Sequence, residues 1–214
     1  MIVQSLIGGF KWASIAYDTS SFSSWTTGTT HTQSHTCTWA NRMLFVAFYS
    51  SNVSDVVTGV TYNGTSMTRV AFLPLTSLGT ESAYLYSLIA PASGANNIVV
   101  SSSSSITVYM ANTSYTGVKQ TGQPEQSNTG GFSNPVTSLT TSVTTTSDNC
   151  WLVGYLRAGG NQTAQSGTTL RTGINLTLQI ADSNWPKSPT GAHSLWATFA
   201  SGHAGQIIAS IAPV

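Results

Sequence analysis

Six acidic side chains are the first candidates for chemistry: Asp18, Asp55, Glu81, Glu125, Asp148 and Asp182. A glycoside hydrolase needs two carboxyl groups about 5–9 Å apart in a cleft. A pairing of Glu81 with Glu125 is open from the sequence. Most of the six acids stand in turn-like contexts, however, and this favours structural roles. We therefore expect no hydrolase activity.

Two short polar clusters have residue types that bind metals. His35 and Cys37 would share one face of a strand, but a metal there needs two more ligands. His31 lies four residues from His35, which on a strand separates them by about 13 Å. The segment Asp182-Ser-Asn184 offers oxygen atoms of the kind that bind Ca²⁺, but it is a single short acidic patch. We expect no metal site.

The sequence contains no motif for nucleophilic or cofactor chemistry. G-x-S-x-G, the P-loop, G-x-G-x-x-G and H-E-x-x-H are all missing from it. We therefore expect a protein that is not an enzyme and that holds no cofactor.

Tryptophan supplies the remaining candidate contact. Trp12, Trp39, Trp151 and Trp196 fall within strand-like patterns, and most of them should be in the core. Trp185 instead lies in the loop-like segment Ser-Asn-Trp-Pro-Lys-Ser-Pro. An exposed loop Trp can stack on a sugar or anchor a protein partner. The alternative is that Trp185 folds back over the end of the domain.

Charge and composition exclude several classes of protein. Only 6% of the residues are charged and the formal net charge is +1, so the basic surface that nucleic acid requires is missing. No apolar run is long enough for a membrane-spanning helix. Ser and Thr make up roughly 30% of the chain, and this composition is typical of a protein that works outside a cell. The two cysteines, Cys37 and Cys150, either form one disulfide or are two buried thiols.

About a dozen short strands must position these residues. Apolar or alternating patterns predict strands over 43–49, 56–62, 66–73, 82–89, 98–102, 106–115, 136–146, 150–157, 174–180, 193–199 and 206–211, with weaker patterns over 10–17 and 31–39. Asn63-Gly64 predicts a tight hairpin turn. The serine run 101–105 would be a bulge or a hairpin tip, and 117–135 would be irregular. The sequence shows no internal repeat. We expect an all-β, antiparallel β-sandwich that is jelly-roll-like.

Three segments resemble a known module. Val60-Thr-Tyr-Asn-Gly-Thr-Ser-Met-Thr-Arg-Val70, Leu85-Tyr-Ser-Leu-Ile-Ala-Pro-Ala-Ser-Gly94 and Ser114-Tyr-Thr-Gly-Val-Lys-Gln120 are similar to a largely uncharacterised module of bacterial and phage surface proteins. That module is similar to jelly-roll, concanavalin-like sandwiches. The resemblance covers residues 40–214 and implies a fold and an extracellular setting, but no catalytic residues.

The first ten residues suggest a separate arm. Ile2, Val3, Leu6, Ile7 and Phe10 are apolar, and Gly8-Gly9 can act as a hinge. We expect residues 1–10 to form an arm that contacts another subunit, and residues 11–214 to form a single domain. The arm has no charged region and no cleavage site of a secretory signal. Either a virus releases the protein by lysis, or a surface protein has a leader outside this numbering.

The expected function follows from these points. We expect a non-enzymatic structural protein on the surface of a phage virion, as a capsid decoration or a tail or fibre component. Its partners would be its own subunits and other virion proteins. The alternatives are a carbohydrate-binding or adhesin module with Trp185 at its site, and a subunit of an extracellular bacterial filament.

Overall fold

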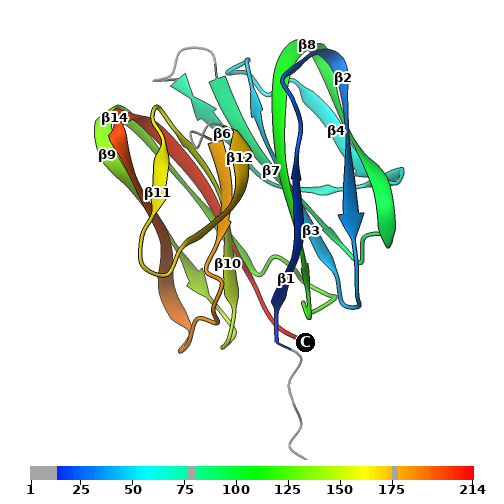
Figure 1. Cartoon of the computed structure of the whole chain (residues 1–214), viewed down its shortest axis with the longest axis vertical. Helices are drawn as coiled ribbons and strands as arrows, with labels where there is room; N and C mark the ends of the chain where they lie inside the picture. The colour runs from blue at the N-terminus through cyan, green and yellow to red at the C-terminus, as the bar shows by residue number, and fades with distance from the viewer. Residues whose placement is uncertain (1–13, 77–80, 175–177) are drawn as a thin grey trace, which may run out of the picture.

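The computed structural model describes residues 14–76, 81–174 and 178–214, and within them the chain is all-β (Figure 1). Two antiparallel sheets pack face to face, so the predicted β-sandwich is confirmed. The jelly-roll connectivity stays a prediction, as does the division into an arm and one domain. None of the described residues forms a helix with the length and hydropathy that a membrane crossing requires.

The first sheet contains the strands from the first half of the chain. Its strand order is β5-β4-β8-β3-β7-β6, and β1 and β2 both pair with β8. The strands are β1 (Ala16–Phe22), β2 (Thr26–Cys37), β3 (Met43–Ser50), β4 (Val57–Tyr62), β5 (Thr65–Ser66), β6 (Thr68–Leu75), β7 (Glu81–Ile89) and β8 (Gly94–Thr116).

The second sheet contains the strands from the second half of the chain. Its strand order is β11-β14-β10-β13-β12, and β9 pairs with β14. The strands are β9 (Gln126–Thr145), β10 (Trp151–Ala158), β11 (Gln162–Ala164), β12 (Thr169–Ile174), β13 (Leu178–Asp182) and β14 (Gly191–Ile211).

The central strands β3 and β10 are apolar on both faces because both faces are covered. In β3, Phe45 packs in the core between the two sheets, whereas Phe48 packs in a second core on the outer face of the first sheet. In β10, Val153 lies between the sheets and Leu152 lies in a further cluster on the opposite face. The continuous apolar runs predicted these buried strands correctly, and Phe45 and Leu152 are both fully buried.

The long strands β8 and β14 bend so that half of each covers the outer face of its own sheet. In β8, Ser101 lies opposite Thr30 and Ile106 opposite Gly28, so the serine run between them is the predicted bulge and not a hairpin tip. Residues on the early half of β8, such as Ile98, then belong to the same outer core as Phe48. The segments 98–102 and 106–115 are therefore parts of one strand.

The two halves of the chain have the same strand arrangement, and this corrects the prediction that there is no internal repeat. Strands β4, β8, β3, β7 and β6 of the first half occupy the same order as β11, β14, β10, β13 and β12 of the second. Strand β9 takes the place of β1 and β2 together, since it pairs with all of β14 as they pair with β8. Residues at the same register position in the two halves are called counterparts below.

Contacts between the halves are reciprocal, as expected for two related units around a twofold axis. Strand β1 contacts β12, and β6, the counterpart of β12, contacts β9. Near the axis, Val118 forms a bridge with Pro213, and the amide of Val214 donates to the carbonyl of Gly117 over 3.1 Å. The segment 117–125, called the linker below, joins the two halves there.

In each half, an acidic residue near the start of the first strand accepts hydrogen bonds from a threonine in a later loop of the same half. Thr38 donates its amide to Asp18 over 2.8 Å and also donates its hydroxyl to that carboxylate. In the second half the Thr146 hydroxyl donates to Glu125 over 2.9 Å. Asp18 and Glu125 are therefore counterparts, and both act in the structure of the turn that follows.

Several predicted strand boundaries were wrong. Residues 126–135, predicted to be irregular, begin β9, and the segments 193–199 and 206–211 form one strand, β14. The predicted strand 174–180 is not continuous, because Ile174 lies on β12 opposite Leu178 on β13. Among the described residues the first strand begins at Ala16, so Ser14 and Ile15 are not part of it as predicted, and residues 10–13 lie outside the described residues. Alternation of apolar residues cannot mark a chain reversal when both arms of the hairpin are apolar.

Candidate functional site

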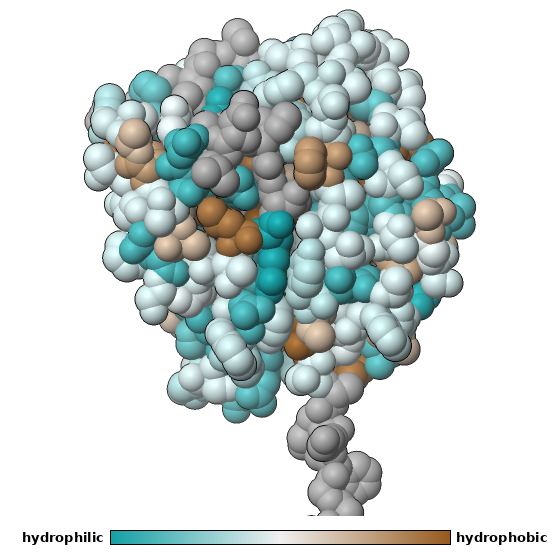
Figure 2. Space-filling model, viewed as in Figure 1, coloured by the Kyte–Doolittle hydropathy of each residue, from teal (hydrophilic) through white to brown (hydrophobic). Residues whose placement is uncertain are grey.

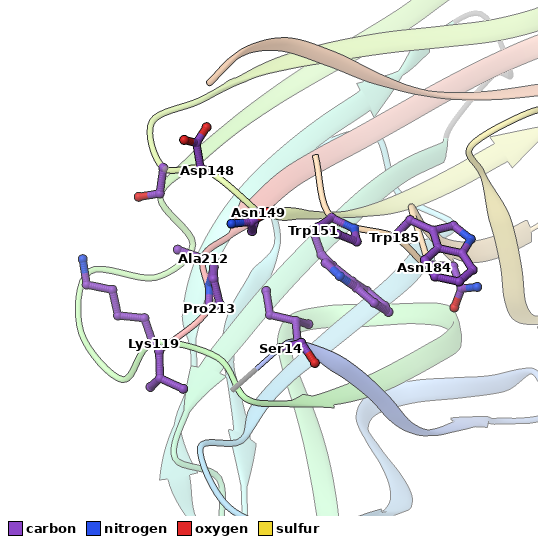
Figure 3. A pocket seen from close by; sticks show the side chains of 13 residues that line it. Ser14, Lys119, Asp148, Asn149, Trp151, Asn184, Trp185, Ala212 and Pro213 are labelled. Atoms are coloured by element: carbon purple, nitrogen blue, oxygen red, sulfur yellow. The ribbon is translucent and has the colours of Figure 1, made fainter. Parts of the chain in front are cut away.

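One end of the sandwich holds a pocket of about 840 Å³ (Figure 3). Both ends of the described chain meet there, because Ser14 and Val214 line the pocket. We call this end of the molecule the terminal end. The residues that line the pocket are Ser14, Ile15, Lys119, Ser147, Asp148, Asn149, Trp151, Asn184, Trp185, Pro186, Ala212, Pro213 and Val214.

Trp185 enters the pocket from a loop that is bonded firmly to β10. The amide of Leu152 donates to the Ser183 hydroxyl over 3.2 Å, and this hydroxyl donates to the carbonyl of Trp185 over 2.9 Å. The amide of Lys187 donates to the carbonyl of Cys150 over 2.7 Å. Both ends of the loop are therefore fixed, and Trp185 projects from a defined backbone.

The loop of Trp185 breaks the correspondence between the halves. In the first half, Ser87 lies opposite Phe45, and Ala90 donates to the carbonyl of Arg42. In the second half, Asp182 lies opposite Val153, and Lys187 makes the matching bond to Cys150. The second loop is thus two residues longer than the first. The extra length makes room for Asn184 and Trp185.

Trp185 is 69% exposed, so most of its indole is open to solvent although it lies at the end of the sandwich. Trp151, the first residue of β10, is only 6% exposed and contacts Tyr115 across the sheet interface with ring centroids 6.1 Å apart. Figure 3 shows both indole rings at the pocket, with Ser14 beside them. The pocket thus has one rigid aromatic wall and one exposed aromatic rim.

A buried ion pair is linked to the pocket through Asn184. The Asp182 carboxylate is fully buried and accepts bonds from Arg171 Nε over 2.7 Å and from the Tyr115 hydroxyl over 2.9 Å. Arg171 also donates to Asn184 Oδ1 and lies 4.2 Å from the centre of the Tyr17 ring. Burial, followed by the charge of Asp182, raises the pKa of Tyr115 well above its usual value. Because Arg171 neutralises Asp182, the Asp182-Ser-Asn184 segment does not present free oxygen ligands to calcium.

Polar groups at the rim remain available for a partner. Asp148 accepts from the amide of Thr190 through Oδ1 over 2.9 Å, and Asn149 accepts from Ser188 through Oδ1 over 3.2 Å. The second carboxylate oxygen of Asp148, the amide nitrogen of the Asn149 side chain and Lys119 Nζ have no hydrogen-bond partner among the described residues. An aromatic wall with carboxamide and carboxylate groups at its rim can bind an apolar side chain, a peptide or a sugar.

The structure does not bring the two glutamates together. Glu81 forms an ion pair with Arg157 over 3.2 Å, and Arg157 lies opposite Gly205 on β14. Glu125 lies at the terminal end, where its amide donates to the carbonyl of Ser210. Five residues of β14 separate the two positions, or about 17 Å, which is beyond the spacing of a glycosidase pair.

Two of the four histidines, His31 and His35, and both cysteines lie in the interior. His35 is 2% exposed and bonds the hydroxyls of Ser21 and Ser114 over 2.8 and 3.2 Å, and burial lowers its pKa to about 4. Cys37 and Cys150 are buried free thiols, so the disulfide alternative is wrong. The described part of the chain contains no group of three or more residues that could hold a metal.

Sequence reasoning missed Trp39. It was expected in a strand, but it follows β2 in the loop before β3, where it is 78% exposed. Trp196 and Trp25 are also well exposed, at 40% and 47%, and Trp12 lies outside the described residues. Of the described tryptophans only Trp151 is in the core. Asn41, two residues after Trp39, has a φ of 50°, and such an Asn in a polar segment is the local signal of a turn.

The predicted assembly contacts Ile2, Val3, Leu6, Ile7 and Phe10 lie outside the described residues. Ser14, the first described residue, lines the pocket. Scans against protein-family models, curated proteins and solved structures found no match to the chain.

Proposed function

We propose that this protein is a non-enzymatic structural subunit of an extracellular assembly, and specifically a surface protein of a phage virion, as a capsid decoration or a tail or fibre component. Its function would be to pack against its own copies and against other virion proteins. One observation carries the proposal: the terminal end concentrates the open pocket, both ends of the described chain and the two most exposed large apolar side chains, Trp39 and Trp185.

Trp39 and Trp185 share this end because their loops are tied to the same junction. Trp39 precedes Asn41, whose carbonyl accepts from Val118, and Val118 pairs with Pro213 at the pocket. Exposed tryptophans at a protein surface are the side chains that most often carry binding energy in interfaces. The terminal end therefore has the character of a contact surface.

The face of the molecule drawn in Figure 2 supports a packing role outside a cell. Figure 2 shows a face of mostly weakly hydrophilic side chains, with hydrophobic side chains only in small separate patches. With 6% charged residues, attraction between such surfaces responds little to salt. Two halves around a shared apolar core give a rigid body with one distinctive end.

Sedimentation velocity of the full chain tests this proposal. Wild type should form oligomers, whereas deletion of residues 1–9 or a Trp39→Ser change should leave a folded monomer. Trp196→Ser is the matched control, because Trp196 is 40% exposed on β14 and does not line the pocket. Its oligomers should be unchanged. A wild type that stays monomeric at every concentration, or variants that assemble normally, would contradict the proposal.

A second function, glycan binding at Trp185, is favoured by the free polar groups of Asp148 and Asn149, which line the same pocket. A glycan array tests it with wild type and Trp185→Ala. Specific binding that the substitution abolishes would establish an adhesin role in place of the structural one.

A further inference from the structure

The linker covers the loop that leads into β3 in the first half. No described segment covers the counterpart loop of the second half in the same way. The Val118 amide donates to the carbonyl of Asn41 over 3.0 Å, and the Gln120 side chain donates to the carbonyl of Arg42 over 3.2 Å. Residues 118–120 thus cover the loop that leads into β3.

The counterpart loop leads into β10 and is open. Asn149 is the counterpart of Asn41, since Trp151 pairs with Ile211 as Met43 pairs with Tyr115, and both asparagines have positive φ values of 61° and 50°. Asp148 and Asn149 line the pocket. The pocket therefore lies where a second linker would pass.

The two ends of the described chain correspond to the two sides of the linker, and the number of linker residues between them can be counted. Val214 stands three residues after Ile211, as Val118 stands three residues after Tyr115. Ser14 stands four residues before Asp18, as Thr121 stands four residues before Glu125. Between Val118 and Thr121 are two residues, and the two that precede Ser14 are Trp12 and Ala13.

We propose that the pocket is the binding site for Trp12 of the same chain, whose indole packs between Trp151, Trp185 and Pro213. Ser14 already lines the pocket, and two residues reach about 7 Å, so Trp12 needs no long connection. The apolar wall matches an indole, which buries about 150–250 Å² when it is enclosed. Residues 12 and 13, together with the C-terminal end at Val214, would then cover the second loop as the continuous linker covers the first.

The chain's own segment is favoured over the same segment from a second copy. A short tether holds Trp12 at an effective concentration in the millimolar range, far above micromolar protein. This inference does not depend on the proposed function, because Trp12 can fill the pocket in a monomer.

Trypsin cleavage after Lys11 tests the inference in the full chain at a concentration where it is monomeric. Docked Trp12 should protect the Lys11–Trp12 bond. Trp185→Ala removes a wall of the pocket without changing the cleavage sequence, and it should raise the rate of release of residues 1–11 by about tenfold or more. Trp39→Ala, which removes an even more exposed Trp on the counterpart side, should leave the rate within about twofold.

Fluorine NMR of the chain labelled with 5-fluorotryptophan gives a second readout that needs no change in the described body. Trp12→Ala should shift the Trp151 and Trp185 resonances and leave that of Trp39 in place. Equal cleavage in wild type and Trp185→Ala, or loss of the Trp12 resonance with no other shift, would overturn the inference. Protection that grows with protein concentration would also overturn it, because the occupant would then be a second copy.

Discussion

The buried His35 should make the protein lose stability as the pH falls below neutrality. His35 lies on β2 between the hydroxyls of Ser21 and Ser114, and Ser114 donates in turn to Asp18 over 2.8 Å. Burial lowers its pKa from 6.5 to about 4, although the Asp18 charge opposes this shift. The neutral imidazole is therefore the form that the fold accepts.

The sign and size of the effect follow from this shift. Between pH 6.5 and about 4 the unfolded chain binds a proton at His35 and the folded chain does not, so folding is disfavoured as the pH falls. The stability is complete above pH 6.5 and is lost progressively down to about pH 4. At about 1.4 kcal/mol per pKa unit, the full loss is about 3 kcal/mol.

Urea unfolding of wild type and His35→Gln at about pH 7.5 and pH 4.5 measures this loss. Wild type should lose about 2–3 kcal/mol more than the variant between the two conditions. The comparison cancels the carboxylates and His31, whose pKa burial also lowers, because both proteins contain them. If both proteins lose the same free energy, His35 does not carry the pH dependence and the reasoning is refuted.

Two other predictions concern the interior. Truncation of Phe45 or Leu152 to Ala should reduce the free energy of unfolding by roughly 2–5 kcal/mol, because both are fully buried in separate apolar clusters; a loss below about 0.5 kcal/mol in urea unfolding would show a surface position. The Cys150 thiol should react with a thiol reagent at about pH 8 only after unfolding, since burial and then Glu125 raise its pKa to about 12. Rapid reaction in the native protein would contradict this, and so would the absence of titratable thiol in urea.

The candidate site was only partly accessible from the sequence. The Ser-Asn-Trp-Pro segment identified Trp185 as a loop residue, because Pro and Asn interrupt a strand pattern. The pocket around Trp185 could not be predicted from the sequence, because Ser14 is 171 positions before Trp185 and 200 positions before Val214. Trp39 was misjudged because aromatic residues next to a strand look like strand residues.

The internal correspondence of the two halves was also hidden. Some counterpart positions hold the same residue, as in the pairs Asn41 and Asn149, and Leu44 and Leu152. At others the residues differ, because Phe45 corresponds to Val153 and Asp18 corresponds to Glu125. A sandwich core accepts any apolar side chain of suitable volume, so a shared strand order survives with few shared residues. The pairing of the strands therefore shows the correspondence between the two halves, whereas a comparison of their residues does not.

The sequence by itself determined the all-β class, the buried strands β3 and β10, and the turn at Asn63-Gly64, whose φ values of 48° and 75° are those that the pair favours. These features depend on periodicity and local backbone preference, which act within a few residues. Only the tertiary structure decided that β8 and β14 bend over their own sheets, that the halves share one arrangement, and that both chain ends meet at one pocket. Those features depend on pairing between residues distant in sequence, and many alternating strands are compatible with several partners until the packing selects one.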